Sequence, residues 1–234
     1  MKRLLILNSK GGCGKTTIAT NLAGYYASSG TPTALIDNDP QGSSKQWLDL
    51  RSQSLSAIHG VFAGKPTPGG MTRAFALRVP VETKRVVIDT PASMKRLEMM
   101  DLLRNASAVI VPLLPSAIDR HVTLDFLNEL TTLCRQMSLQ IPLGIVANRV
   151  RLNTLSFKRL REMLDERGIP LVAYLRDAQS YVHAAEAGCS ITELKPTAQK
   201  QELLQWTALV YWLESGRIPP HLGKARSENN PVPA

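Results

Sequence analysis

The sequence predicts an α/β protein with a doubly wound, mainly parallel sheet and helices on both faces. Three observations favour this fold. Short runs rich in Val, Ile and Leu alternate with longer stretches of helical periodicity, which is the pattern of successive βαβ units. A glycine-rich segment follows the first run, and aspartates end the second and the third. Because open parallel sheets bind ligands at the carboxyl ends of their strands, we expect the functional residues at that edge.

The predicted elements follow one another along the chain without an internal repeat. Most expected strands are almost continuous apolar runs, as is typical of strands covered on both faces. They are 3–8, 33–37, 85–89, 108–113, 143–147 and 171–174. Helical periodicity predicts helices at 15–28, 41–51, 119–137, 156–168 and 199–214. The segment 60–70 is rich in Gly, Pro and Thr and is expected to be a surface loop.

Length and composition indicate one globular domain. We expect the domain to cover 1–216 and a polar, Pro-rich mobile tail to follow at 217–234. The three cysteines, Cys13, Cys134 and Cys189, are odd in number and far apart, which favours a reducing compartment over a disulfide framework. The first residues do not form a secretion signal, and no apolar run approaches the roughly 20 residues of a membrane span. We therefore expect a cytoplasmic protein.

The first strand leads into the segment Ser-Lys-Gly-Gly-Cys-Gly-Lys-Thr-Thr at 9–17, where the next helix is expected to begin. This is the pattern of a phosphate-binding P-loop, because glycines let backbone N–H groups surround a phosphate and the helix N-terminus adds partial positive charge. Lys15 is expected to reach the β- and γ-phosphates, and the Thr16 hydroxyl to hold Mg²⁺. The predicted nucleotide-binding residues of the loop are Gly11, Gly12, Cys13, Gly14, Lys15, Thr16 and Thr17.

Three aspartates are expected at the same edge of the sheet. Asp37 and Asp39 lie at the end of the second strand, and Asp89 ends the third. The run 85–89 is the pattern of a Walker B strand, whose terminal carboxylate faces Mg²⁺, so Asp89 is a predicted metal ligand. Because Asp39 precedes Pro40 at the start of a predicted helix, a helix cap is an alternative role for this carboxylate, and both roles remain open.

The loop departs from the usual P-loop pattern, because Ser9 stands where a glycine is usual and a second lysine, Lys10, follows it. Here the sequence resembles the deviant Walker A family, Lys-Gly-Gly-x-Gly-Lys-Thr, which includes ParA, MinD, the nitrogenase iron protein and arsenite-pump ATPases. It looks most like small ParA partition and positioning ATPases, McdA-type relatives included. The resemblance implies a Mg²⁺-dependent ATPase with weak basal activity that forms a homodimer on binding ATP. It also implies a catalytic role for Lys10, reaching the partner subunit's ATP.

Other assignments rest on this resemblance alone. The segment 37–41 looks like the Asp-x-Asp-Pro-Gln motif of ParA proteins, which implies that Asp39 activates the attacking water and Asp37 helps to hold the Mg²⁺ hydration shell. The strand ending near Asn148 looks like the family's nucleotide-base strand, which implies an adenine contact by its amide. The segment 174–177 resembles the part that closes over base and ribose, which implies a nucleotide contact for Arg176.

The positive charge bears on what the ATPase is for. The formal net charge of +9 indicates a surface that attracts polyanions. Resemblance to ParA implies nonspecific duplex DNA as a partner in the ATP state, nucleoid association, and a cargo adaptor of ParB or equivalent type that stimulates hydrolysis. Such DNA contacts need charge rather than base-reading groups. The candidates are Arg149, Arg151, Lys158, Arg159, Arg161, Arg176, Lys195 and Lys200. A solvated helix face is the alternative for those at 158–161.

Two other functions remain open. A MinD-like switch would end in a basic amphipathic helix that inserts into membranes, whereas the apolar stripe of 199–214 is expected to pack on the core, so no membrane partner is expected. A small-molecule ATP-dependent synthetase of the dethiobiotin or cobyrinate type would use a related sheet, but it would leave the positive charge unexplained. Plasmid, chromosome and protein-assembly cargos, carboxysomes among them, also remain open.

Overall fold

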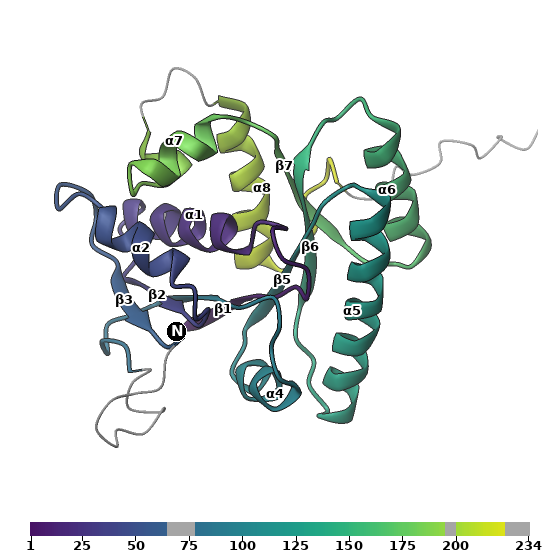
Figure 1. Ribbon diagram of the computed structural model, residues 1–234, viewed down its shortest axis with the longest axis horizontal. Coiled ribbons are helices and arrows are strands. Elements are labelled where there is room, and N and C mark those ends of the chain that lie inside the picture. Colours follow the sequence, from purple (N-terminus) through teal and green to yellow (C-terminus); the bar gives the residue numbers. More distant parts are fainter. Residues whose placement is uncertain (65–77, 195–199, 223–234) are drawn as a thin grey trace, which may run out of the picture.

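The strands of the computed structural model, which describes residues 1–64, 78–194 and 200–222, form one sheet in the order β3-β2-β4-β1-β5-β6-β7 (Figure 1). They are β1 (Lys2–Ile6), β2 (Thr33–Asp37), β3 (His59–Phe62), β4 (Arg85–Asp89), β5 (Ala108–Leu113), β6 (Leu143–Val150) and β7 (Leu171–Arg176). All pairings between neighbouring strands are parallel. The strand order reverses around β1, so the loop that follows β1 opens into the crevice where such sheets bind ligands.

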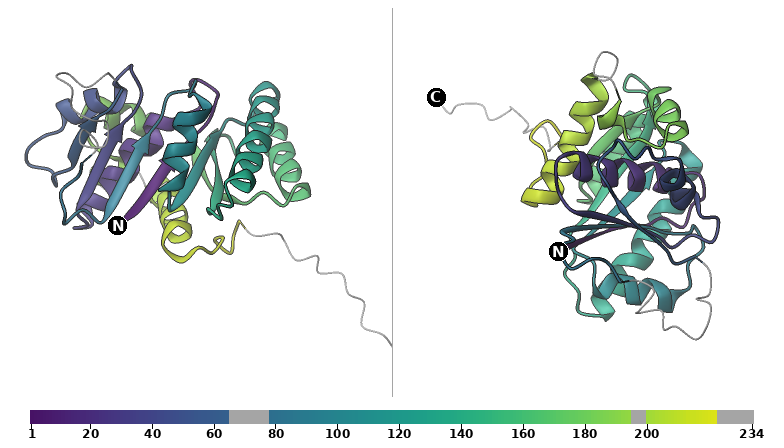
Figure 2. Two further views of the ribbon diagram at one scale, coloured as in Figure 1. Left: turned by 90° about the horizontal axis from the view of Figure 1, so that it is seen from below. Right: turned by 90° about the vertical axis from the view of Figure 1, so that its left-hand side faces the viewer.

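Helices cover both faces of this sheet. One face carries α1 (Lys15–Ser28), α2 (Ser43–Leu50), α7 (Ser180–Glu186) and α8 (Lys200–Ser215), and the other carries α4 (Arg96–Arg104), α5 (Ala117–Gln136) and α6 (Leu155–Glu166). Figure 2 shows the sheet between these two layers. Side chains alternate along β1, so Leu5 belongs to the core under α4, α5 and α6, whereas Leu4 and Ile6 belong to the core under α1 and α8. The predicted doubly wound α/β fold is confirmed.

All predicted strands and helices are present, with ends displaced by a few residues. The structure adds β3, α4 and α7. The predicted loop at 60–70 was wrong in its first residues, because 60–62 belong to β3, while 65–70 lie outside the described residues. A Cβ at Gly60 would lie 2.8 Å from Cδ1 of Leu48, so the glycine that suggested a loop lets α2 pack against this edge strand. Helix α4 was not predicted because it buries only Met99 and Leu103, so its sequence shows little hydrophobic periodicity.

The chain remains packed beyond α8. Pro219 and Leu222 are buried, and Leu222 belongs to the core under α4, α5 and α6. These residues open the segment expected to be a mobile tail, of which 223–234 lie outside the described part. None of the described helices is long and apolar enough to cross a membrane.

Candidate functional site

The loop between β1 and α1 surrounds its own lysine. Lys15 is 7% exposed, and its Nζ donates to the carbonyl oxygens of Asn8 and Lys10, each at 3.1 Å. Gly14 adopts a φ of 99°, which favours glycine, and a Cβ there would lie 1.9 Å from Nδ2 of Asn148. The structure therefore brings a buried ammonium group and a glycine-rich turn together at the start of α1, which is the arrangement a phosphate site requires.

Asn148 fastens this loop to the end of β6. Its Nδ2 donates to the carbonyl oxygen of Cys13 at 2.9 Å, and its Oδ1 accepts from the backbone N–H of Arg149 at 2.9 Å. One N–H and one lone pair of the amide remain for the predicted adenine contact. Arg149 has a φ of 50°, in the left-handed region that non-glycine residues rarely adopt, where the β6–β7 register shifts. Asn148 thus positions the phosphate loop as well as standing near the expected base site.

Asp89 and Asp37 end neighbouring strands and are register partners in the sheet. Both are 1% exposed. Oδ2 of Asp89 accepts from the hydroxyls of Thr16 at 2.8 Å and Ser44 at 2.7 Å. Burial raises the pKa of Asp89 to about 6; the two hydroxyl donors act against the rise, and the nearby Asp37 charge adds to it. The two residues predicted to hold Mg²⁺ after the first strand and at the end of the third, Thr16 and Asp89, are therefore in direct contact.

The other two aspartates organise the turn between β2 and α2. Oδ1 of Asp37 accepts from the backbone N–H of Asp39 at 3.0 Å, and its Oδ2 accepts from that of Lys45 at 2.8 Å. Burial raises the pKa of Asp37, and the N–H of Lys45 is the largest opposing cause. Oδ1 of Asp39 accepts from the N–H of Gln41 at 3.0 Å, which is an Asx turn. The N-cap position of α2 is Gly42, without a side-chain cap, so Asp39 does not cap this helix.

The oxygen atoms at this edge of the sheet are suitable ligands for Mg²⁺. Oδ1 of Asp89 is buried and has no hydrogen-bond partner among the described residues, next to the Thr16 hydroxyl. Within the described part of the chain, no group of three His, Cys, Asp or Glu side chains could hold a metal alone. Mg²⁺ commonly binds through one or two carboxylates, water and the phosphates of its nucleotide, and such a site needs no larger cluster. Thr16 and Asp89 are therefore the residues that would hold it.

Lys10 lies on the outer side of the loop and pairs with Asp119 of the same chain. The Nζ–Oδ1 distance is 3.7 Å, and the Lys10 side chain is 38% exposed. Asp119 is fixed in the first turn of α5, where its N–H donates to the hydroxyl of the N-cap Ser116 and its Oδ2 accepts from that hydroxyl. The signature lysine is therefore held close to the phosphate site by one solvent-accessible ion pair.

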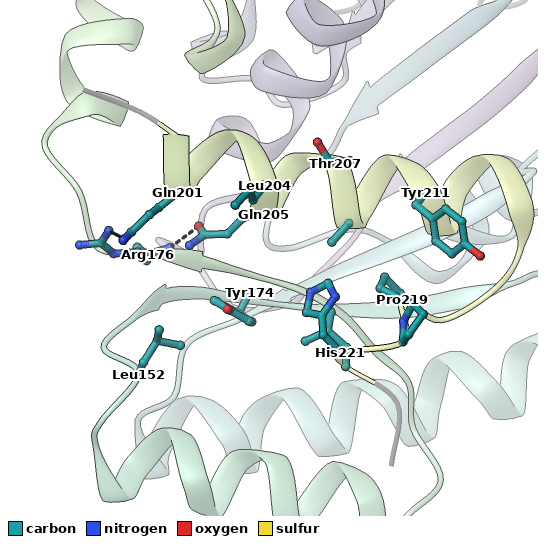
Figure 3. A pocket seen from close by; sticks show the side chains of 13 residues that line it. Leu152, Tyr174, Arg176, Gln201, Leu204, Gln205, Thr207, Tyr211, Pro219 and His221 are labelled. Carbon is teal, nitrogen blue, oxygen red and sulfur yellow. Dashed lines mark hydrogen bonds between the residues drawn. The ribbon is translucent and has the colours of Figure 1, made fainter. Parts of the chain in front are cut away.

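Arg176, the residue expected to contact the nucleotide, contacts α8. Its guanidinium donates to Oε1 of Gln201 (Figure 3). It also lies 3.8 Å from Oε1 of Glu202 on the same helix. The candidates for DNA contact on β6 and α6 are all exposed, and so is Lys200 at the start of α8, whereas Lys195 lies outside the described residues. Lys158 also pairs with Glu162 at 3.9 Å. Exposure of these side chains is compatible with DNA contact and with a solvated face.

Three residues of the site were not predicted from the sequence. Ser44 is fully buried and donates to Asp89, Asp119 pairs with Lys10, and Asn8 supplies a carbonyl to Lys15 and an Nδ2 donor to the carbonyl of Pro112 at 2.6 Å. The Ser-x-x-Asp spacing at 116–119 is a helix-start signal that could have drawn attention to Asp119. Ser44 offered none, because its contact joins residues 45 positions apart.

Comparisons with known proteins identify the family. Residues 4–191 match the profile described as "CobQ/CobB/MinD/ParA nucleotide binding domain". The chain is 28% identical over 192 residues, 82% of its length and 87% of the relative's, to "Maintenance of carboxysome distribution protein A" of Halothiobacillus neapolitanus. A putative plasmid partition protein of Borrelia burgdorferi bound to AMPPNP matches with a TM-score of 0.70 and 17% identity, covering 92% of this chain and 99% of that one.

Cobyrinic acid a,c-diamide synthase of Mycobacterium smegmatis with ADP and magnesium matches with a TM-score of 0.66 and 20% identity, covering 94% and 98% of the two chains. At these identities the structural matches establish the fold alone. The profile match covers most of the chain, and ATP hydrolysis with ATP and Mg²⁺ as ligands is confirmed at the level of the family. The chain belongs to the CobQ/CobB/MinD/ParA family of nucleotide-binding proteins.

Proposed function

We propose that this protein is an ATPase that dimerises around ATP, binds duplex DNA without sequence preference in that state, and positions a cargo through an adaptor that stimulates hydrolysis. The observation that carries the proposal concerns Lys10. Its side chain is 38% exposed, and among the described residues its ammonium group pairs with Asp119 alone, at 3.7 Å. A flexible cation in that place can reach a phosphate bound by a second subunit.

The proposed site uses each residue in a defined way. The Lys15 ammonium exchanges the carbonyls of Asn8 and Lys10 for phosphate oxygens. Thr16 and Asp89 hold Mg²⁺, which neutralises phosphate charge when bound. Asp39 orients the attacking water, and Asp37 holds the turn that carries Asp39 through its two backbone hydrogen bonds, besides its expected place near the Mg²⁺ hydration shell.

The proposed purpose rests on relatives and on charge. The Halothiobacillus relative is named for carboxysome distribution, and the Borrelia structure is described as a plasmid partition protein. A net charge of +9 and the exposed basic side chains of β6 and α6 supply the contacts that DNA phosphates need. We propose a cytoplasmic, nucleoid-associated protein with a ParB-like or equivalent adaptor.

Binding to a random duplex measured without nucleotide, with ADP and with ATP and Mg²⁺, over a series of salt concentrations, tests this function. We expect tight, salt-sensitive DNA binding in the presence of ATP and Mg²⁺, and not with ADP or without nucleotide. This binding should be lost in Lys15→Ala and weakened in the triple variant Lys158→Ala, Arg159→Ala and Arg161→Ala. Equal binding in all nucleotide states, or unaltered DNA affinity in Lys15→Ala, would contradict the proposal.

A further inference from the structure

A pocket lies at the β7 edge of the sheet, and none of its described lining residues belongs to the β1–α1 loop. Its volume is about 600 Å³, and its walls come from β7, from the outer face of α8 and from the segment 219–222 (Figure 3). The apolar walls include Leu204, Ala208, Tyr174 and Leu222. Leu204 is 70% exposed although it lies on a helix whose opposite side is part of the core. The pocket is thus an apolar concavity of the size that small organic ligands occupy.

The polar groups of the pocket are the cation of Arg176 and several amide, hydroxyl and imidazole groups, each of which can donate or accept a hydrogen bond. Figure 3 shows Arg176 and Gln201 at one end, and His221 with Tyr211 at the other. The Oε1 of Gln205 accepts from the backbone N–H of Arg176 at 3.0 Å, which leaves the amide N–H groups of Gln205 for a ligand. None of the described residues that line the pocket is Asp or Glu. The cation of Arg176 therefore favours a ligand with a negatively charged acceptor group.

The guanidinium of Arg176 has two partners on α8. Its Nη1 donates to Gln201, and the buried carboxylate of Glu202 lies 3.8 Å away. That carboxylate is 6% exposed and fixes the guanidinium at the end of the pocket. Because an arginine can donate from several N–H groups in one plane, the remaining groups can bind a second anion, as in sites that recognise carboxylates. Arg176 therefore marks the end of the pocket where an anionic head would bind.

We propose that this pocket binds a small organic anion with a carboxylate or similar head at Arg176 and an apolar body of about ten carbons along Leu204 and Tyr174. Duplex DNA does not fit, because the walls are apolar and concave. The inference goes beyond the proposed function. It uses no residue of the β1–α1 loop, and it assigns Arg176 a ligand other than the nucleotide or the DNA phosphates expected from the sequence.

Calorimetric titration with decanoate, below its micelle concentration, tests the proposal against decyltrimethylammonium, which has the same chain and the opposite charge. We expect one decanoate per chain with a dissociation constant of about 0.1–1 mM, as for a ligand of this size, and binding of the cation at least about tenfold weaker. Equal binding of the two amphiphiles would overturn the proposal. So would binding to phosphatidylglycerol vesicles without binding of soluble decanoate, because the source of the anion would then be a membrane.

Two matched variants locate the site. Leu204→Glu places a like charge on the pocket wall at an exposed position and should weaken decanoate binding more than about tenfold without lowering the melting temperature or the ATPase rate. Leu97→Glu makes the same change at a residue of α4 that is 74% exposed and should leave binding unaltered. Arg176→Gln should reduce the preference for the anion about tenfold. Decanoate binding that is equal in wild type and Leu204→Glu would refute the assignment.

Discussion

Two carboxylates at opposite ends of the sheet have pKa values shifted in opposite directions. At the carboxyl ends of the strands, Asp89 receives two hydroxyl donors, and burial raises its pKa to about 6. At the other end, burial also opposes ionisation of Glu214, but hydrogen bonds from Arg85, Lys2 and Tyr26 outweigh it and lower the pKa to about 2. Glu214 is thus stabilised in its charged form by neighbouring cations, whereas Asp89 has one buried oxygen without a hydrogen-bond partner among the described residues, as the proposed Mg²⁺ site requires.

Glu193, like Glu214, is a carboxylate that pairs with a cation and stabilises the fold. Arg51 follows α2 and Glu193 lies in the 3₁₀ turn η2 (Ile191–Glu193); their side chains are 6% and 4% exposed. The guanidinium forms two hydrogen bonds to the carboxylate, lies 5.4 Å from the Trp47 ring centroid, and donates to the carbonyl of Gly188 at 3.3 Å. The pair therefore ties α2 to the segment after α7.

The largest expected effect is on stability, from breaking this pair. Arg51→Met leaves the Glu193 carboxylate buried without its cation and should cost about 3–5 kcal/mol of unfolding free energy in chemical denaturation. The double variant Arg51→Met and Glu193→Leu should recover most of that loss. A single variant that costs less than about 1 kcal/mol would remove the structural role assigned to the pair.

Asp89→Asn should separate function from stability. Turnover should fall at least about 100-fold, equivalent to about 2.7 kcal/mol, because Mg²⁺ loses its carboxylate. Stability at pH 7 should rise by about 1–3 kcal/mol, because the fold no longer buries an ionised group. Glu214→Gln is the control: it should destabilise the protein and leave turnover unaltered. If Asp89→Asn lowers stability instead, the carboxylate is structural and the contrast fails.

The two carboxylates should also give opposite pH dependence. The folded pKa of Glu214 lies below its ordinary value of 4.5, so its stabilising contribution is present above pH 4.5 and is lost as pH falls toward 2. The folded pKa of Asp89 lies above its ordinary 3.8, so its contribution is complete below pH 3.8 and is lost as pH rises through 6. Unfolding free energies of wild type, Asp89→Asn and Glu214→Gln between about pH 2 and 7.5 would reveal both slopes.

The smallest expected effect concerns the ion pair of Lys10. Asp119→Asn frees the Lys10 ammonium group from its partner in the same chain. The dissociation constant of the ATP-dependent dimer should therefore fall by up to about fivefold, because a partly exposed ion pair contributes at most about 1 kcal/mol. Light scattering over a concentration series measures the change. Weaker association would show that Asp119 orients Lys10 toward the partner subunit, rather than holding it away from the partner.

Local sequence patterns predicted the parts of the site that depend on neighbours in the chain. The β1–loop–α1 order places Lys15 and Thr16, and parallel register sets Asp37 beside Asp89. Contacts made by packing distant segments could not be predicted. Ser44 meets Asp89 because α2 folds over the strand ends, and the guanidinium of Arg176 turns toward α8 because Gln201 and Glu202 lie there. Strand β3 was missed because it has four residues, one of them the glycine that α2 requires.

The most direct test of the account is the mass of the protein in solution with its nucleotides. Sedimentation of wild type and Lys10→Ala is compared with ADP and with a non-hydrolysable ATP analogue, Mg²⁺ being present throughout, together with a measurement of analogue binding. The account predicts that wild type is a monomer with ADP and a dimer with the analogue, and that Lys10→Ala binds the analogue but remains a monomer. Dimers of Lys10→Ala as abundant as those of wild type, or a wild type that stays monomeric with the analogue bound, would contradict it.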